Sequence, residues 1–141
     1  MNREIKFRGK RKYNCEWVEG DLETSLVPKG SMSKCPAICT TEGTIGSFFV
    51  CNDTVGQFTG LKDKNGKDIY EGDILMCIGQ REDNKGRKYF RKVLFIDGTF
   101  GMRVPEYKCV SSLFNHVVDG KLNWEVVGNI YDNPELLEEK L

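Results

Sequence analysis

Short runs of alternating polar and apolar residues recur along the chain and predict β-strands, because successive side chains of a strand point to opposite faces. The first run covers residues 4–8, where Ile5 and Phe7 alternate with charged side chains. Comparable runs cover 15–19, 44–51, 69–78, 89–96, 100–104 and 122–131. Glycine-containing turns separate the runs roughly every ten residues, a spacing typical of all-β proteins. The pattern predicts a mostly β protein.

Two dipeptides mark tight hairpins. Asn65-Gly66 and Asp97-Gly98 contain residues that tolerate positive φ, as two-residue hairpin turns require. Residues 79–92 are polar and basic and predict a solvated loop or the exposed end of a hairpin. In the following run we expect Phe90, Val93 and Phe95 to point inward.

The runs suggest where the sheets and domains lie. Residues 68–131 supply about five short strands, and a small SH3-like or partly open β-barrel hides their edges economically. We therefore expect an N-terminal β segment over 1–64 and a small barrel over 65–141, which can also form one continuous domain. A short C-terminal helix is predicted over 133–140, with Asn133 as its cap and Pro134 at its first position.

Composition and charge exclude several classes of protein. The 141 residues hold 21 Lys and Arg against 21 Asp and Glu, so the net charge is zero. This balance argues against a protein that coats nucleic acid or an anionic membrane. A hydrophobic content of 39% with 30% charged residues indicates a folded chain. No apolar stretch is long enough to span a membrane and no export signal is evident, so we expect a cytosolic protein.

The six cysteines are expected to be reduced thiols. Without an export signal a disulfide framework is not favoured. Cys35 and Cys39 form a C-x3-C pair, but zinc usually requires a second close pair of ligands, and the other cysteines and His116 stand alone. Cys51 and Cys77 lie in apolar runs and are expected to be buried. We predict no metal and no cofactor, and zinc at Cys35 and Cys39 remains the alternative.

Catalytic motifs are not evident. The sequence has no G-x-S-x-G, P-loop, G-x-G-x-x-G or H-E-x-x-H pattern. Asp21, Glu71 and Asp73 flank glycines, which favours roles in turns over acid–base chemistry. We therefore expect a protein that is not an enzyme. An enzyme that uses scattered carboxylates or a thiol is the less favoured hypothesis.

Three parts of the chain resemble the YopX family. They are the opening at 3–10 with 17–22, the middle at 54–66 with 69–74, and the ending at 125–137. Residues 23–53 show no pattern of that family. The resemblance implies a protein encoded by a phage or prophage, present in the bacterial cytoplasm, mostly β, with a barrel-like C-terminal part. The family provides no catalytic residues that could be mapped onto this chain.

The resemblance and the missing motifs lead to a first functional hypothesis. We expect a non-enzymatic phage accessory protein that binds a host component, either as a counter-defence inhibitor of a host protein or by sequestering a small signalling molecule. Polar side chains around the middle turns are the predicted binding residues: Gln57, Thr59, Lys62, Asp63, Glu71 and Asp73. The alternative is that these residues only support the turns and the packing.

Nucleic-acid binding is the second hypothesis. Basic and aromatic side chains alternate in the segment that contains Lys88, Tyr89, Arg91 and Lys92, a mixture that pairs phosphate contacts with base stacking. Residues 1–12 also hold six basic residues and one acid, which suits either a nucleic-acid patch or a charged edge strand. Exposed strand edges are compatible with a homo-oligomer.

Overall fold

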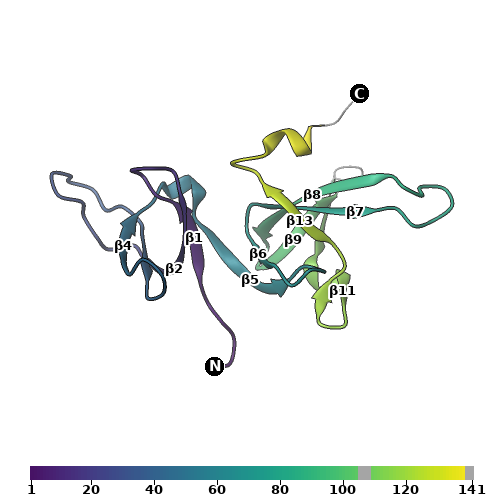
Figure 1. Ribbon diagram of the computed structural model, residues 1–141, viewed down its shortest axis with the longest axis horizontal. Coiled ribbons are helices and arrows are strands. Elements are labelled where there is room, and N and C mark those ends of the chain that lie inside the picture. The colour runs from purple at the N-terminus through teal and green to yellow at the C-terminus, as the bar shows by residue number, and fades with distance from the viewer. Residues whose placement is uncertain (105–108, 139–141) are drawn as a thin grey trace. The chain divides into compact units, whose positions relative to one another are not determined.

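The chain folds into two compact units, which we call unit 1 (Met1–Phe58) and unit 2 (Thr59–Leu141) (Figure 1). The computed structural model describes residues 1–104 and 109–138. The boundary expected from the sequence, after residue 64, lies inside unit 2. A strand links the two units, because β5 (Gly56–Lys62) begins in unit 1 and ends in unit 2.

Unit 1 is built on an antiparallel sheet. Its strands are β1 (Phe7–Lys10), β2 (Trp17–Glu23), β3 (Ala37–Thr40) and β4 (Gly46–Phe49), in the order β4-β3-β2-β1, and the start of β5 pairs with β1. A 3-10 turn, η1 (Asn52–Thr54), precedes β5. Gly20 allows β2 and β3 to approach closely, because a Cβ there would lie 2.2 Å from the carbonyl oxygen of Cys39.

The segments that follow β1 and β4 pair with each other. Val50, directly after β4, forms an isolated antiparallel bridge with Arg11, directly after β1. The Lys12 amide donates to the Phe49 carbonyl at 3.0 Å, and the Cys51 amide donates to the Lys10 carbonyl at 2.8 Å. Val50 is fully buried. The bridge places the turn after β1 beside the end of β4.

Unit 2 holds most of the strands. A five-stranded antiparallel sheet has the order β10-β9-β8-β7-β13, and β6 pairs with β5. Among the described strands no pairing joins β10 to β13, so this sheet stays open. The mostly β prediction is confirmed. The elements are β6 (Asp68–Tyr70), β7 (Asp73–Ile78), β8 (Lys88–Ile96), β9 (Thr99–Val104), β10 (Cys109–Ser112), η3 (Leu113–His116), β11 (Val117–Val118), β12 (Lys121–Leu122), β13 (Glu125–Asn129) and η4 (Pro134–Leu137).

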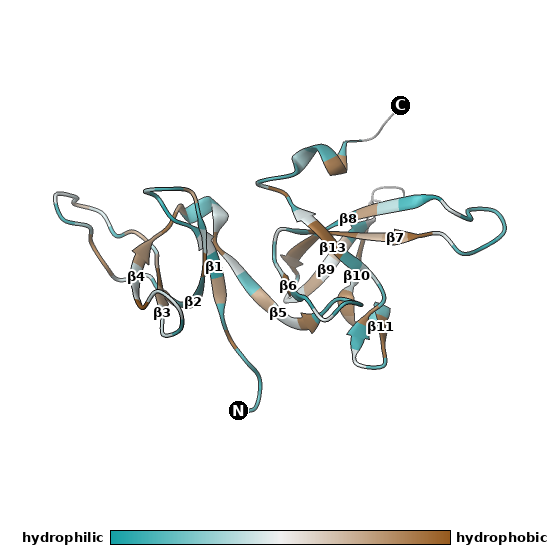
Figure 2. Cartoon of the chain, viewed as in Figure 1, coloured by the Kyte–Doolittle hydropathy of each residue, from teal (hydrophilic) through white to brown (hydrophobic). Residues whose placement is uncertain are grey.

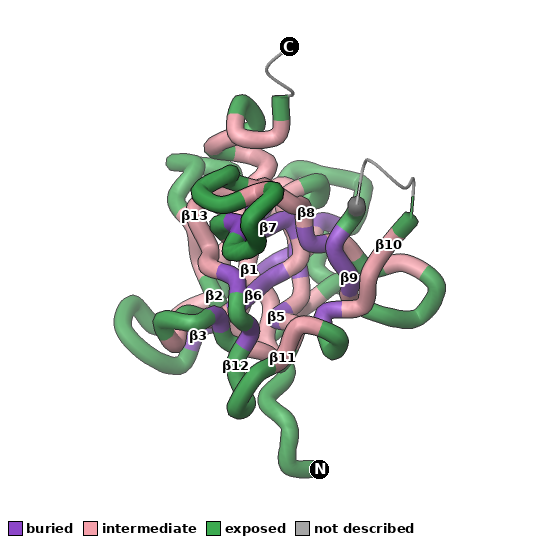
Figure 3. The backbone as a smooth tube through the Cα atoms, turned by 90° about the vertical axis from the view of Figure 1, so that its right-hand side faces the viewer, coloured by how far each residue is buried: buried purple, intermediate pink, exposed green. Residues whose placement is uncertain are grey.

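The core of unit 2 draws on elements spread over its whole length. Buried stretches on β6, β7, β8 and β9 can be followed in Figure 3. Tyr89, Cys77 and Val126 are partly buried against the core cluster. The buried members of the cluster are Ile69, Leu75, Val93, Met102, Leu113, Leu122 and Trp124.

Both predicted hairpins are present. Gly66 (φ 84°) turns the chain between β5 and β6, and Asp97 (φ 51°) with Gly98 (φ 77°) turns it between β8 and β9. Of the two alternatives for residues 79–92, the structure shows the end of a hairpin, in which β7 pairs with β8 from Ile78 and Lys88 onward (Figure 2).

The expectation that Phe90 and Phe95 point inward with Val93 is wrong. Phe90 and Val93 are an odd number of residues apart, so they lie on opposite faces of β8. Tyr89 takes the inward position. Phe95 lies near the strand end, is 54% exposed and meets Phe100 edge-on at 5.1 Å.

The predicted C-terminal helix is a single 3-10 turn, η4, with Pro134 at its start. The Asn133 side chain makes no cap hydrogen bond and instead accepts the amide of Asn129 at 3.2 Å. Residues 139 and 140 of the predicted helix lie outside the described residues. Within the described ranges, no helix has the length and apolar character that crossing a membrane requires.

Candidate functional site

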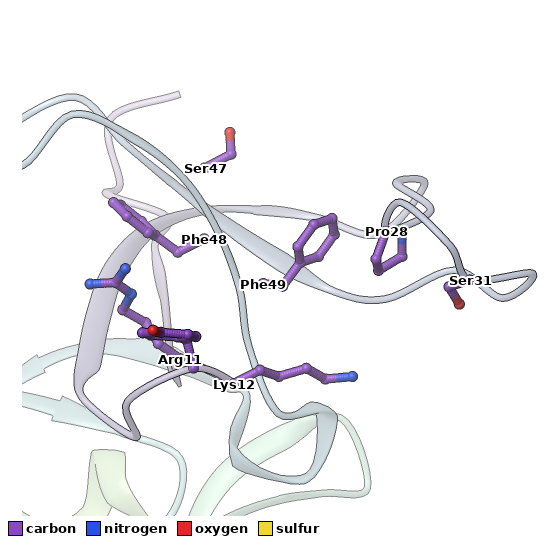
Figure 4. A pocket seen from close by; sticks show the side chains of 8 residues that line it. Arg11, Lys12, Pro28, Ser31, Ser47, Phe48 and Phe49 are labelled. Carbon is purple, nitrogen blue, oxygen red and sulfur yellow. The ribbon is translucent and has the colours of Figure 1, made fainter.

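A groove with a volume of about 540 Å³ opens on unit 1 (Figure 4). Three segments form it: the turn after β1, the loop between β2 and β3, and strand β4. Its lining combines two cations, three aromatic rings, a proline and two hydroxyls, from Arg11, Lys12, Tyr13, Pro28, Ser31, Ser47, Phe48 and Phe49.

Backbone hydrogen bonds hold the turn that carries the cations. The Arg11 amide donates to the Glu16 carbonyl and the Cys15 amide donates to the Arg11 carbonyl, both at 2.9 Å. Cys15 takes a left-handed conformation with φ 60°. This tight reversal exposes Tyr13, whose relative accessibility is 94%.

Arg11 is oriented by its neighbours. Its guanidinium carbon lies 4.2 Å from the centre of the Phe48 ring, a cation–π contact (Figure 4). A guanidinium nitrogen is also 4.0 Å from the Glu16 carboxylate, at the limit of an ion pair, and the Glu16 side chain is 71% exposed. An ion pair at this distance and this exposure contributes little to holding the Arg11 side chain in place, so Phe48 is its better-defined partner.

The opposite wall is the loop between β2 and β3, which its own backbone hydrogen bonds close. The Cys35 amide donates to the Leu26 carbonyl and the Ser31 amide donates to the Pro28 carbonyl, each at 2.9 Å. Figure 4 shows the Pro28 ring beside the Phe49 ring. The lining therefore combines apolar side chains, such as Pro28 and Phe49, with the cations of Arg11 and Lys12.

The charge of the groove is one-sided. The described residues that line it include Arg11 and Lys12 and no carboxylate. A smaller depression of unit 1, about 260 Å³, is mainly acidic, with Lys6 in its lining beside four carboxylates, those of Glu4, Glu19, Asp21 and Glu42. Opposite charges are thus separated on unit 1 although the whole chain is neutral.

The predicted binding residues on β5 are engaged within the fold. Gln57 belongs to unit 1, where it pairs with Phe7 of β1. In unit 2 the Thr59 hydroxyl donates to the Ile69 carbonyl at 2.8 Å. The Lys62 ammonium contacts the Asp68 carboxylate at 2.6 Å.

The predicted carboxylates lie at turns. Asp63 is 1% exposed and accepts the amides of three residues. Asp73 is 2% exposed and accepts the Tyr70 amide at 2.8 Å. Glu71 stands in the turn before Gly72, which has φ 86°. These contacts join neighbouring segments of unit 2, and the ligand role of the residues stays a prediction.

The residues predicted for nucleic-acid contact do not share one surface. Alternation along β8 puts Lys88 and Lys92 on one face and Tyr89 and Arg91 on the other. The guanidinium carbons of Arg87 and Arg91 lie 5.1 Å and 5.5 Å from the Tyr89 ring centre. Tyr89 is also partly buried against the core.

The cysteines are free thiols, and all six lie in the described part of the chain. The Cys39 sulfur contacts the Ser47 hydroxyl at 3.2 Å, while the buried Cys35 faces the Val50 carbonyl at 3.8 Å. Burial raises the pKa of the Cys77 thiol, partly opposed by the charges of Arg91 and Lys64. Among the described residues, no group of three or more His, Cys, Asp or Glu side chains is placed to hold a metal ion.

One polar pair was not anticipated from the sequence. The Ser111 hydroxyl and His116 Nε2 are 2.9 Å apart, and the imidazole meets the Trp124 ring edge-on at 6.1 Å. Burial lowers the pKa of His116, which favours the neutral ring. Of the described hydrogen bonds, none joins a carboxylate to this imidazole, so the pair lacks the third group that orients a catalytic histidine. The sequence spacing of Ser111 and His116 did not predict this contact, because it is the 3-10 turn η3 that brings the two side chains together.

Comparison with known proteins assigns the chain to a family. The model of the YopX protein family matches residues 6–138. The chain belongs to the YopX family. The match includes residues 23–53, where the sequence alone showed no family pattern and where much of the groove lies.

A solved structure supports this YopX fold. The chain is similar to the crystal structure of protein EF1440 from Enterococcus faecalis, with 29% identity and a TM-score of 0.57. The alignment covers 97% of this chain and 100% of that one. No curated protein sequence matches the chain.

Proposed function

We propose that this YopX-family protein is a non-enzymatic phage accessory protein that binds a host component through the groove of unit 1. The observation that carries the proposal is the lining of the groove, which includes three aromatic rings and two cations and no carboxylate, the exposed Glu16 standing outside it at 4.0 Å from Arg11. Concave, largely apolar sites with a few placed polar groups are typical of ligand sites.

The state of the other candidate residues supports the choice of this groove. The side-chain polar groups of Thr59, Lys62 and Asp63 form hydrogen bonds within unit 2. In the groove, by contrast, the Tyr13 ring is almost fully exposed. An exposed aromatic side chain beside two cations is typical of a contact surface.

The experiment compares matched double variants in the host bacterium. We would purify the tagged full-length protein, K12A/Y13A and K121A/F114A, and analyse each by native mass spectrometry. Each variant loses one lysine and one exposed ring, the first pair in the groove and the second in unit 2, where Phe114 is 79% exposed. The same spectra give the number of subunits.

We expect a component of defined mass on the natural protein and on K121A/F114A, and its loss from K12A/Y13A. A component that stays on all three proteins would contradict the groove as its site. The absence of any component from all three would contradict the binding function.

A further inference from the structure

We propose that the ligand of the groove is a nucleobase joined to a phosphate, which rests on the binding function proposed above. The chemistry of the lining carries this inference. The base needs flat apolar surfaces, the phosphate needs cations, and the groove supplies both within about 540 Å³. Sites of roughly 300–1,000 Å³ enclose ligands of this size.

Tyr13 and Arg11 provide two stacking surfaces. The Tyr13 ring stands at a turn fixed by backbone hydrogen bonds and is 94% exposed, so both of its faces are open to a planar partner. The Arg11 guanidinium lies over Phe48 at 4.2 Å, and its side chain is 29% exposed. Bases stack on tyrosine rings and on guanidinium planes alike.

Lys12 and Arg11 provide the positive charge. The cation–π contact with Phe48 holds the Arg11 guanidinium carbon 4.2 Å from the ring centre, and the guanidinium N–H groups can donate to phosphate oxygens. Figure 4 shows the Lys12 side chain extending from the same turn along the groove. The hydroxyls contribute less, because that of Ser31 already bonds to Ser33 and that of Ser47 to Cys39.

Charge complementarity and ring geometry together favour this ligand over an acidic peptide. Carboxylates of a peptide would satisfy Lys12 and Arg11 but would leave the Tyr13 ring without a planar partner. A nucleotide satisfies both features at once. The acidic depression of unit 1 would repel the same ligand, which confines it to the groove.

The test measures binding of defined probes to the full-length protein by isothermal titration calorimetry. The probes are AMP, adenosine, inorganic phosphate, deca-deoxyadenylate and a hexaglutamate peptide. If base and phosphate act together, AMP binds at least about tenfold more tightly than adenosine or phosphate alone. Tighter binding of the oligonucleotide that weakens steeply with salt identifies single-stranded nucleic acid as the source, whereas AMP binding without that gain identifies a free nucleotide.

Matched variants locate the site. Tyr13→Ala is expected to weaken AMP binding about tenfold, and Tyr13→Phe to retain it, because stacking needs the ring and not the hydroxyl. Lys12→Ala should weaken AMP and phosphate binding but not adenosine binding. Phe114→Ala and Lys121→Ala are the controls and should bind as the natural protein does. Far-ultraviolet circular dichroism verifies that each variant is folded.

Three results would overturn the proposal: no binding of AMP or oligonucleotide, equal binding by Tyr13→Ala and the natural protein, or binding of hexaglutamate in preference to AMP. In the last case, loss of hexaglutamate binding in Lys12→Ala would show that the groove is still a binding site, for a different class of ligand. The failure of the ligand class is thus distinguishable from the failure of the binding function.

Discussion

His116 is the chain's single histidine, and its surroundings favour the neutral ring. The imidazole bonds to the Ser111 hydroxyl at 2.9 Å and packs edge-on against Trp124. Burial lowers its pKa, since the charged form loses hydration. A charge at this position would also face the apolar cluster that contains Leu113, Leu122 and Trp124.

A pH dependence of stability follows from this lowered pKa. On acidification the unfolded chain takes up the histidine proton first, so stability is full above the ordinary histidine pKa of about 6.5 and declines as the pH falls below it. We expect the melting temperature of the natural protein to fall between about pH 7.5 and 5.5. His116→Gln should remove most of that slope, and equal slopes for both proteins would contradict the assignment.

Among the elements, the β5–β6 hairpin is fastened to β13 by one carboxylate. Asp63 Oδ1 accepts the amides of Asn65 and Lys67 at 2.8 and 2.9 Å within the turn. Its Oδ2 accepts the amide of Val126, across 63 residues of sequence, at 2.9 Å. The side chain is 1% exposed, so water cannot replace these bonds. Asp63 therefore joins a local turn to a distant strand.

We expect Asp63→Asn to lower the free energy of unfolding by about 2–4 kcal/mol, because an amide can accept at only one of the two positions and leaves a buried N–H without a partner. Urea denaturation followed by circular dichroism measures the change. Asp83→Asn is the matched control, since that carboxylate is exposed and only 3.6 Å from an exposed Arg81, and it should change stability by no more than about 0.5 kcal/mol. A small effect at Asp63 would contradict its role as a tether.

For the molecule as a whole, stability rests on two small β cores with no disulfide bond among the described residues. All six cysteines are free thiols, distributed over both units. Cys15 and Cys109 are exposed, whereas Cys35 is buried at 5% accessibility. The thiols therefore differ in access, and Cys77 differs also through its raised pKa.

The rate at which each cysteine reacts with a thiol reagent should follow its exposure and its thiol pKa. At neutral pH we expect Cys15 and Cys109 to react first, Cys77 more slowly because less thiolate is present, and Cys35 last, after local opening. Labelling over time, with peptide mass mapping, gives the order. Dithiothreitol should leave the melting temperature unchanged. A fast Cys35, or a melting temperature lowered by reduction, would contradict the structure.

The strand content, the two hairpin turns and the family were all predictable from the sequence. Alternation has a period of two, and Asn-Gly and Asp-Gly encode positive φ locally, so these features need no distant contacts. Predictions from the local pattern were wrong where contacts with other residues determine the orientation of a side chain. The pattern placed Phe90 inward although Tyr89 packs against the core, and it predicted a cap at Asn133, whose side chain makes no cap hydrogen bond to η4.

The candidate site depends on contacts between distant parts of the chain. The Arg11–Val50 bridge brings the turn after β1 against β4, and the groove exists because of that long-range pairing. Ser111 and His116, and Asp63 and Val126, likewise meet only in the fold. Strand pairing between distant residues depends on the packing of whole faces, which one-dimensional patterns do not specify. The lining residues were visible in the sequence, but their convergence was not.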